Sequence, residues 1–234
     1  MLRATIPFVS QGLRALTRDI TECRTCPRLV RCRESAARAI PKRFTGHTYW
    51  ARPIAGFGDP RARLLVVGLA PAAHGGNRTG RVFTGDRSGD WLYAALHRAG
   101  FANQSTSTAR DDGLVLTDAY VTTIVRCAPP DNKPNPTERD RCIAYFIREL
   151  RLLPQVRAII ALGAFAWDGV LRAARALGHV VKPRPAFGHC ARAEIGPYVM
   201  FGSYHVSQQN TFTGRLTEPM LDAVFAAARA CSRG

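Results

Sequence analysis

The sequence predicts an α/β fold of three layers, α/β/α, in which a short and mostly parallel central sheet is covered by helices on both faces. Short apolar runs that are typical of buried strands alternate four times with amphipathic segments that are typical of helices. The 234 residues are 46% apolar, which is enough for one sizeable core and favours a single domain over residues 1–234. In such folds function is expected in the loops beyond the carboxyl ends of the strands.

Each element has its own signal. The first strand is an apolar run that ends at Ala70-Pro71, and the helix after it has Ser88 as its expected N-cap and Gly100 at its end. Pro136 and Thr137 open the next helix. Residues 34–60 look like an irregular basic connection. The expected strands are 62–69, 118–126, 156–162 and 197–206, and the expected helices are 88–99, 137–153, 163–177 and 217–231.

The charge balance indicates a polyanionic partner. There are 33 Lys and Arg residues against 17 Asp and Glu, which leaves a net charge of +16. A GC-rich genome would explain the preference for arginine over lysine, but it would not explain the excess of positive charge. Nucleic acid is the simplest such partner, and its binding should weaken with salt.

Composition also indicates the compartment. No run of about eighteen apolar residues is present, so a membrane span is not expected. The cysteine count is odd, at seven, and no secretory signal is visible. We therefore expect a reduced, cytoplasmic setting.

Four cysteines form two pairs that suit a metal site. Cys23 and Cys26 have the C-x-x-C spacing, and Cys127 and Cys142 form a wider pair about a hundred residues later. Four thiolates suit either zinc or an iron–sulfur cluster, and the spacing does not decide between them. Such a site would tie the N-terminal segment, residues 1–60, to the middle of the fold. Structural or incidental roles are expected for Cys32, Cys190 and Cys231.

A glycine-rich loop over residues 68–89 invites comparison with a phosphate-binding loop. Gly75 and Gly80 have the G-x-x-x-x-G spacing, but Arg81 stands in the lysine position and Val82 in the hydroxyl position. Because the hydroxyl ligand of magnesium is missing, a nucleotide hydrolase is disfavoured. The glycines more simply let backbone approach a ligand closely.

Three strings carry a family resemblance. They are GLAPAAHGGNRTGRVFTGDRSG, VRCAPPDNKPNPTERDRC and SYHVSQQNTFTGRLT, and together they resemble family 5 (type B) uracil-DNA glycosylases of bacteria and archaea. The resemblance runs from Cys23 to the C-terminal helix. It implies a uracil-DNA glycosylase-like fold, a 4Fe-4S cluster, and excision of uracil and other deaminated bases from duplex DNA. The cluster ligands would be Cys23, Cys26, Cys127 and Cys142.

His205 is the first catalytic candidate. It leaves the last strand at the position of the glycosylase HPS-type motif, although Val206 replaces the proline of related families. A histidine at a strand end can also be a purely structural residue. As a catalyst, its N–H would stabilise the negative charge on the departing base, together with backbone N–H groups of the glycine loop.

The water-activating residue of related enzymes is missing. Ala70 stands where other uracil glycosylases carry Asp, Asn or Glu, and Asn77 is the nearest polar substitute by motif position. Asn77 could orient a water but is a poor base. Most of the rate is then expected from stabilising the leaving base.

Two further residues are expected to recognise the base. Phe83 matches the aromatic that stacks on the flipped base, although a core phenylalanine is the plain alternative. Thr123 stands where uracil-selective relatives place an Asn, and a hydroxyl discriminates less than an amide. We expect a relaxed range that covers uracil and hypoxanthine, with xanthine and exocyclic adducts as further candidates.

The remaining expectations concern partners. Substrate-binding roles are expected for Ala70, His74, Gly75, Phe83 and Thr123, and DNA-binding roles for Arg78, Gln208, Asn210 and Arg215. Since no lysine lies at a recognised nucleophile position, the enzyme should leave an abasic site without cutting the strand. We expect a monomer in the cytosol or nucleoid of a bacterium or archaeon. The alternative is an iron–sulfur nucleic-acid-binding module without catalysis.

Overall fold

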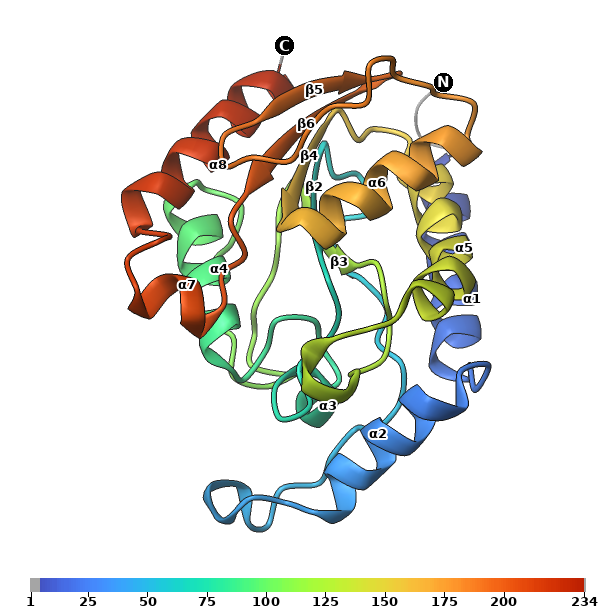
Figure 1. The fold of residues 1–234 in the computed structure, drawn as a ribbon, viewed down its shortest axis with the longest axis vertical. Helices are drawn as coiled ribbons and strands as arrows, with labels where there is room; N and C mark the ends of the chain where they lie inside the picture. The colour runs from blue at the N-terminus through green and yellow to red at the C-terminus, as the bar shows by residue number, and fades with distance from the viewer. Residues whose placement is uncertain (1–4, 234) are drawn as a thin grey trace.

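A six-stranded sheet forms the centre of the protein in a computed structural model that describes residues 5–233 (Figure 1). The strand order is β1-β3-β2-β4-β6-β5, in which β3, β2, β4 and β6 run parallel and the two outer strands are antiparallel. The strands are β1 (Phe57–Gly58), β2 (Leu64–Gly68), β3 (Ala119–Thr123), β4 (Ala158–Leu162), β5 (Arg192–Ile195) and β6 (Tyr198–Ser203). The predicted short, mostly parallel sheet is confirmed.

Helices cover both faces of this sheet, so the predicted three-layer α/β fold is also confirmed. In Figure 1, α4 and α8 lie on one side of the strands, and α1, α5 and α6 on the other. The helices are α1 (Thr5–Thr21), α2 (Pro27–Arg38), α3 (Gly76–Thr79), α4 (Arg87–Arg98), α5 (Pro136–Leu152), α6 (Ala164–Ala176), α7 (Gln208–Phe212) and α8 (Glu218–Arg233). Two 3-10 turns, η1 (Lys42–Phe44) and η2 (Pro130–Asn132), complete them.

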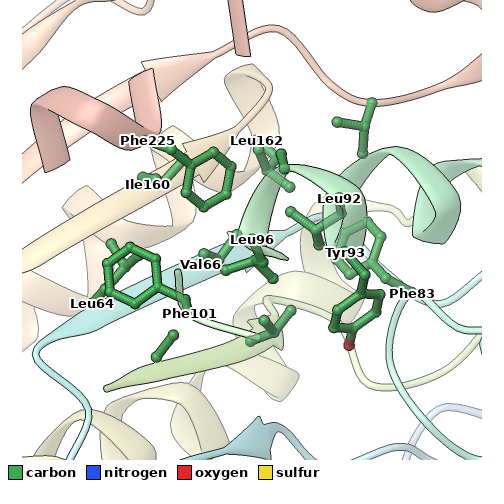
Figure 2. Close-up of a cluster of buried hydrophobic side chains, with 14 of the residues drawn as sticks. Leu64, Val66, Phe83, Leu92, Tyr93, Leu96, Phe101, Ile160, Leu162 and Phe225 are labelled. Atoms are coloured by element: carbon green, nitrogen blue, oxygen red, sulfur yellow. The ribbon is translucent and has the colours of Figure 1, made fainter. Parts of the chain in front are cut away.

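The alternation of side chains along β2 explains why two helical layers are needed. Leu64 and Val66 join the core beneath α4 and α8, whereas Leu65 and Val67 join the core beneath α5 and α6. Successive side chains of a strand point to opposite faces, so an all-apolar strand must be covered twice. Figure 2 shows the first of these cores, with Phe83 at its margin.

Side-chain caps fix where two helices begin. The carboxylate of Asp86 accepts the Gly89 N–H at 3.0 Å, so Asp86 is the N-cap of α4 and the predicted cap, Ser88, lies inside the helix. The Ser88 prediction is wrong because Asp86 has the extended backbone that a cap requires. At α5, Asn135 and Glu138 form a reciprocal capping box.

The N-terminal segment is more helical than expected. Residues 34–38 continue α2, whereas the sequence suggested an irregular connection from residue 34. Ion pairs attach α1 and α2 to α5. Asp19 of α1 pairs with Arg148 at 2.6 Å, and Arg28 of α2 pairs with Glu138 at 2.8 Å. A single domain over residues 1–234 stays a prediction, and residues 1–4 and 234 lie outside the described part. Within that part, no helix has the length and apolarity to cross a membrane.

Candidate active site

The carboxyl ends of the parallel strands meet at one edge of the sheet and bring five predicted or neighbouring residues together. Gly68 at the end of β2 pairs with Thr123 at the end of β3. His205 follows β6, and its Cβ lies 3.4 Å from the place that a Cβ on Gly163, after β4, would take. Phe83 lies over Gly68 and faces His205. We call Gly68, Phe83, Thr123, Gly163 and His205 the carboxyl-edge site.

His205 is held as a neutral imidazole. Burial lowers the pKa of His205 to about 4, far below its ordinary value of 6.5. Among residues 5–233 no group forms a hydrogen bond with its ring, whose nearest aromatic neighbour is Phe83 at 6.3 Å between centroids. A neutral imidazole carries one N–H, so this side chain can donate a hydrogen bond to a bound molecule.

Phe83 is a core side chain that also borders the site. It is 7% exposed and belongs to the core beneath α4 (Figure 2). A Cβ on Gly68 would come within 2.4 Å of its ring, so only glycine permits this approach. Its backbone φ of +50° is unusual for an aromatic residue, and such strain is often found at functional sites. Stacking on a flipped base stays a prediction for Phe83.

Thr123 offers an oxygen and no free proton. It is 1% exposed, and its hydroxyl donates to the carbonyl of Val125 at 2.9 Å. Because that proton is used, the remaining capacity of the Thr123 oxygen is to accept a hydrogen bond.

Asn77 lies in a different environment from the one expected. It is 1% exposed, and its amide nitrogen donates to the carbonyls of Arg33 at 3.1 Å and Ala73 at 3.3 Å. Its Oδ1 is buried and has no hydrogen-bond partner among the described residues. The contacts of the Asn77 amide nitrogen therefore link the glycine loop to α2, whereas its Oδ1 remains able to accept a hydrogen bond, so the role of orienting water stays a prediction.

The loop before Asn77 contacts the N-terminal segment. Ala70 is half-buried just after β2. His74 shares a hydrogen bond of 2.9 Å between its Nδ1 and the Tyr49 hydroxyl, and it lies beside Phe44. A Cβ on Gly75 would overlap the carboxylate of Asp86, the N-cap of α4, so only glycine leaves room for this side chain. The structure thus shows His74 and Gly75 in loop packing, and their substrate contacts stay predictions.

Arg78 does not reach the surface as a DNA-binding residue should. Its side chain is 9% exposed, and its guanidinium donates to the carbonyls of His74 and Gly85, each at 2.8 Å. It also lies 4.3 Å from the centre of the Phe44 ring. Since these donors are already engaged, Arg78 stabilises the glycine loop, and the expected phosphate contact does not fit this conformation.

A buried ion pair fixes the other end of the glycine loop. Arg81 and Asp112 are joined at 2.7 Å, and Arg81 also donates to the hydroxyls of Thr84 and Ser107. Burial alone would raise the pKa of Asp112, but Arg81 and backbone N–H groups hold it well below the usual range. Sequence reasoning missed this pair, because nothing in the spacing indicates that residues 31 apart are in contact.

The segment after His205 carries the other predicted DNA contacts. Gln208 is exposed on α7. Asn210 turns inward, where its amide donates to the carbonyl of His205 at 2.8 Å. Arg215 is exposed, and its guanidinium lies 4.7 Å from the centre of the Tyr204 ring. Gln208 and Arg215 are therefore available to DNA, whereas Asn210 braces the backbone of the catalytic candidate.

The first half of the cysteine site is centred on Arg33. Arg33 is 2% exposed, and its Nη1 donates to the sulfur of Cys127 and to the carbonyl of Cys23, each at 3.2 Å. Its Nε is buried without a partner among the described residues. Burial is the main reason that the pKa of the Cys127 thiol is raised to about 11, and the Arg33 guanidinium opposes this shift. A negatively charged group at this place would satisfy the buried guanidinium.

The second half of the cysteine site, around Cys142, also has an N–H group that donates to sulfur. The backbone N–H of Arg126 donates to the Cys142 sulfur at 3.3 Å, and burial raises the pKa of that thiol to about 12. Within residues 5–233, no three His, Cys, Asp or Glu side chains are grouped closely enough to hold a metal ion. Cysteines that ligate a cluster bind separate irons and are spread wider than ligands of one ion. The four thiols, with the N–H groups of Arg33 and Arg126 beside two of them, are compatible with a group that is ligated by thiolates.

Comparison with known proteins agrees with this geometry. The model of the uracil DNA glycosylase superfamily matches residues 55–229. A type-5 uracil-DNA glycosylase of Mycobacterium tuberculosis is 53% identical over 212 residues, covering 90% of this chain and 78% of the relative. One from Thermus thermophilus is 48% identical over 92% of this chain and 96% of the relative, and one from Pyrobaculum aerophilum is 42% identical over 90% and 89%. The chain therefore belongs to the uracil DNA glycosylase superfamily, and within it to the type-5 uracil-DNA glycosylases.

Proposed function

We propose that this protein is a monofunctional DNA glycosylase that excises uracil and related deaminated bases from duplex DNA. Its family membership supports hydrolysis of an N-glycosyl bond. The observation that carries the proposal is the neutral, unpartnered imidazole of His205 at the carboxyl-edge site. A donor preorganised in this way stabilises negative charge that develops on a bound group.

The reaction breaks the bond between the sugar and the base. The bonding electron pair leaves with the base, and the oxygen of a water molecule bonds to the sugar carbon, which has oxocarbenium character in the transition state. The proton that this water loses goes to solvent, and the base anion takes up a proton, so that the products are a neutral base and an abasic sugar. The N–H of His205 would donate to the oxygen of the departing base. Since the amide of Asn77 is engaged with backbone, the leaving base is the main target of stabilisation and general-base help is minor.

Thr123 supports the relaxed substrate range. Its oxygen can only accept a hydrogen bond, because its proton is used on Val125. Uracil and hypoxanthine both carry a ring N–H beside a carbonyl, so an acceptor alone recognises what they share. We therefore propose both as substrates, with xanthine and exocyclic adducts as further ones.

A panel of these bases tests this range. Each base is placed in the same oligonucleotide, in single- and double-stranded form, and excision is measured under single-turnover conditions. We expect uracil and hypoxanthine to be removed at comparable rates. Thr123→Asn should raise the preference for uracil. An amide can make two hydrogen bonds to the uracil edge, so it loses more binding energy with another base than a hydroxyl does. Strict uracil-only activity of the unaltered protein would exclude the proposal.

The four paired cysteines are proposed to hold a 4Fe-4S cluster. Cys23, Cys26, Cys127 and Cys142 would ligate it, and when bound it would supply a structural link with no open position for substrate. Anaerobically purified protein should be brown and absorb broadly near ~400 nm, as thiolate-ligated iron–sulfur does. A colourless, zinc-loaded preparation of full activity would exclude the cluster.

The activity itself is tested with a uracil-containing duplex. The protein is incubated with the duplex, which is then heated in alkali to cleave any abasic site. Cleavage at uracil only after alkali is expected. Cleavage before alkali would contradict the monofunctional assignment, and tight binding without any cleavage would indicate the non-catalytic binding module. We further propose that the protein acts in the cytoplasm, as a monomer.

A further inference from the structure

The segment over residues 24–50 carries much of the excess positive charge. It contains seven Lys and Arg residues and a single carboxylate, that of Glu34, which pairs with Arg24 at 2.8 Å. Four other cations of the segment are exposed, and within residues 5–233 none of them forms an ion pair: Arg31, Arg38, Lys42 and Arg43. We call α2 and η1, which carry these four side chains, the basic arm. Surface cations without carboxylate partners indicate a negatively charged ligand.

The basic arm is attached to the glycine loop. The amide of Asn77 donates to the carbonyl of Arg33 on α2 at 3.1 Å. On η1, the ring of Phe44 lies 4.3 Å from the guanidinium of Arg78 and 4.9 Å from that of Arg43. In Figure 1, α2 and the segment after it lie beyond α3, which belongs to this loop. Because the glycine loop follows β2, the arm lies beyond the carboxyl edge of the sheet.

The spacing of the cations on α2 suits the backbone of a nucleic acid. Arg31 and Arg38 are seven residues apart, so they lie on the same face of the helix, and Ser35 lies between them. At the usual helical rise they are about 10 Å apart along the axis, whereas phosphates of one strand recur about every 3.4 Å along a duplex. The arm is therefore long enough to contact several successive phosphates.

A groove between α2 and the glycine loop has the same character. It holds about 490 Å³, and its lining includes Arg31 and Ser35 of α2, His74 of the glycine loop and Pro130 after β3. No carboxylate of the described residues lines it. Guanidinium and hydroxyl groups are typical donors to phosphate oxygens. The groove thus offers donors to a phosphate without repelling its charge.

We propose that the basic arm binds the backbone of duplex DNA on one side of the extruded nucleotide, with its four exposed cations contacting phosphates. This inference rests on the proposed glycosylase function, which places DNA at the carboxyl-edge site. Phosphate contacts position a protein on the duplex without reading its sequence, which suits an enzyme that finds a damaged base in any sequence. Since the arm is joined to the glycine loop, these contacts also hold that loop beside the DNA.

Binding to an undamaged duplex tests the arm whether or not the protein excises a base. Two double variants remove charge and keep helix propensity: Arg31→Gln with Arg38→Gln, and Lys42→Gln with Arg43→Gln. Each should weaken binding and reduce the slope of log affinity against log salt by about two.

A matched control removes the same charge elsewhere. Arg151→Gln with Arg175→Gln takes two exposed cations from the last turns of α5 and α6. Because α6 begins at the carboxyl end of β4, its last turn lies away from the carboxyl edge. This variant should bind with the slope of the unaltered protein. Equal slopes for the control and the arm variants would overturn the proposal and would leave an acidic protein as the partner that suits these cations.

Shortening a uracil-containing duplex tests the predicted side. Helix α2 is about 18 Å long, or about five base pairs of duplex, so trimming that flank to about two base pairs removes most phosphates within its reach. Trimming one flank should weaken binding of the unaltered protein more than trimming the other, and the arm variants should lose this difference. The same difference in the variants would contradict the proposal. If the unaltered protein excises no uracil, the glycosylase function fails, and the slopes on undamaged duplex still decide whether the arm binds DNA.

Discussion

His205 shows how burial sets the protonation state of a residue for which we propose a catalytic role. The site gives the ring no charged partner, and loss of solvent alone keeps it neutral. A neutral imidazole does not attract the phosphates of DNA as an imidazolium would. Its N–H has no partner among residues 5–233 and is therefore available to a bound base. The sequence identified this residue by its motif position, but its protonation state depends on packing that no motif reveals.

Replacing His205 and replacing Asn77 should have unequal effects. His205→Ala removes the donor to the leaving base and should lower the single-turnover rate by about 100- to 1,000-fold. Asn77→Ala removes two hydrogen bonds to backbone and should cost more in stability than in chemistry. Rates and urea unfolding curves of both variants provide the measurement. Equal and complete loss of activity in two folded variants would reject this ranking.

The lowered pKa of His205 also predicts how stability depends on pH. Between pH 6.5 and about 4 the unfolded chain binds a proton at His205 that the folded protein does not. The free energy of unfolding should therefore fall as the pH is lowered through this window. Urea unfolding at pH 7 and pH 5 measures it, with His205→Gln as the non-titrating control. The control should lose less stability, and identical losses would contradict the assigned pKa.

At the level of elements, the alternation of inner strands and helices was readable from the sequence, whereas the N-caps Asp86 and Asn135 and the short or edge segments were not. The inner strands β2 and β4 were located because an apolar run marks burial on both faces, and β3 was located by its β-branched residues. The edge strands β1 and β5, of two and four residues, carry no such run. The helix α1 was also not predicted. Arg78 was expected to bind DNA, and only the fold shows that its guanidinium donates to carbonyls inside the protein.

The join between β3 and α5 depends on a buried ion pair. Arg126, just after β3, and Glu149 of α5 are each 1% exposed and are joined at 2.7 Å. Glu149→Ala would leave a buried guanidinium unpaired and should destabilise the protein by about 3–5 kcal/mol. Removing the exposed partner Glu194 from its pair with Arg192 should cost less than about 1 kcal/mol.

Denaturant unfolding of both variants separates these two cases. The double variant Arg126→Met with Glu149→Leu, which removes both charges, should recover much of the loss. If Glu149→Ala and Glu194→Ala unfold at the same urea concentration, the buried pair is not needed to join β3 to α5.

The whole molecule is strongly cationic and presents short sheet edges. Its net charge is +16, and the exposed Arg215 lies against Tyr204, the residue before His205. On β5, the side chains that face outward are Arg192 and Glu194. Short, charged edge strands resist pairing with a second sheet, which supports the proposed monomer. The charge excess was plain from composition, whereas its placement around the site required the fold.

Salt dependence should report the DNA-facing side of the molecule. Binding to a duplex should weaken linearly on a plot of log affinity against log salt. Arg215→Ala should reduce the slope by about one, whereas Arg192→Ala, on the edge strand β5, should leave it unchanged. Fluorescence anisotropy over a salt series measures both. Equal slopes for the two variants would show that Arg215 does not contact phosphate.

Arg33 has a consequence for the cell. Its guanidinium contacts the Cys127 sulfur, and its carbonyl holds Asn77 of the glycine loop. One residue of α2 thus joins the proposed cluster to the glycine loop. If the cluster is present as proposed, a cell short of iron would assemble this protein with a loosened glycine loop. Base excision would then slow although the protein was still being made, so that iron supply would limit this repair step.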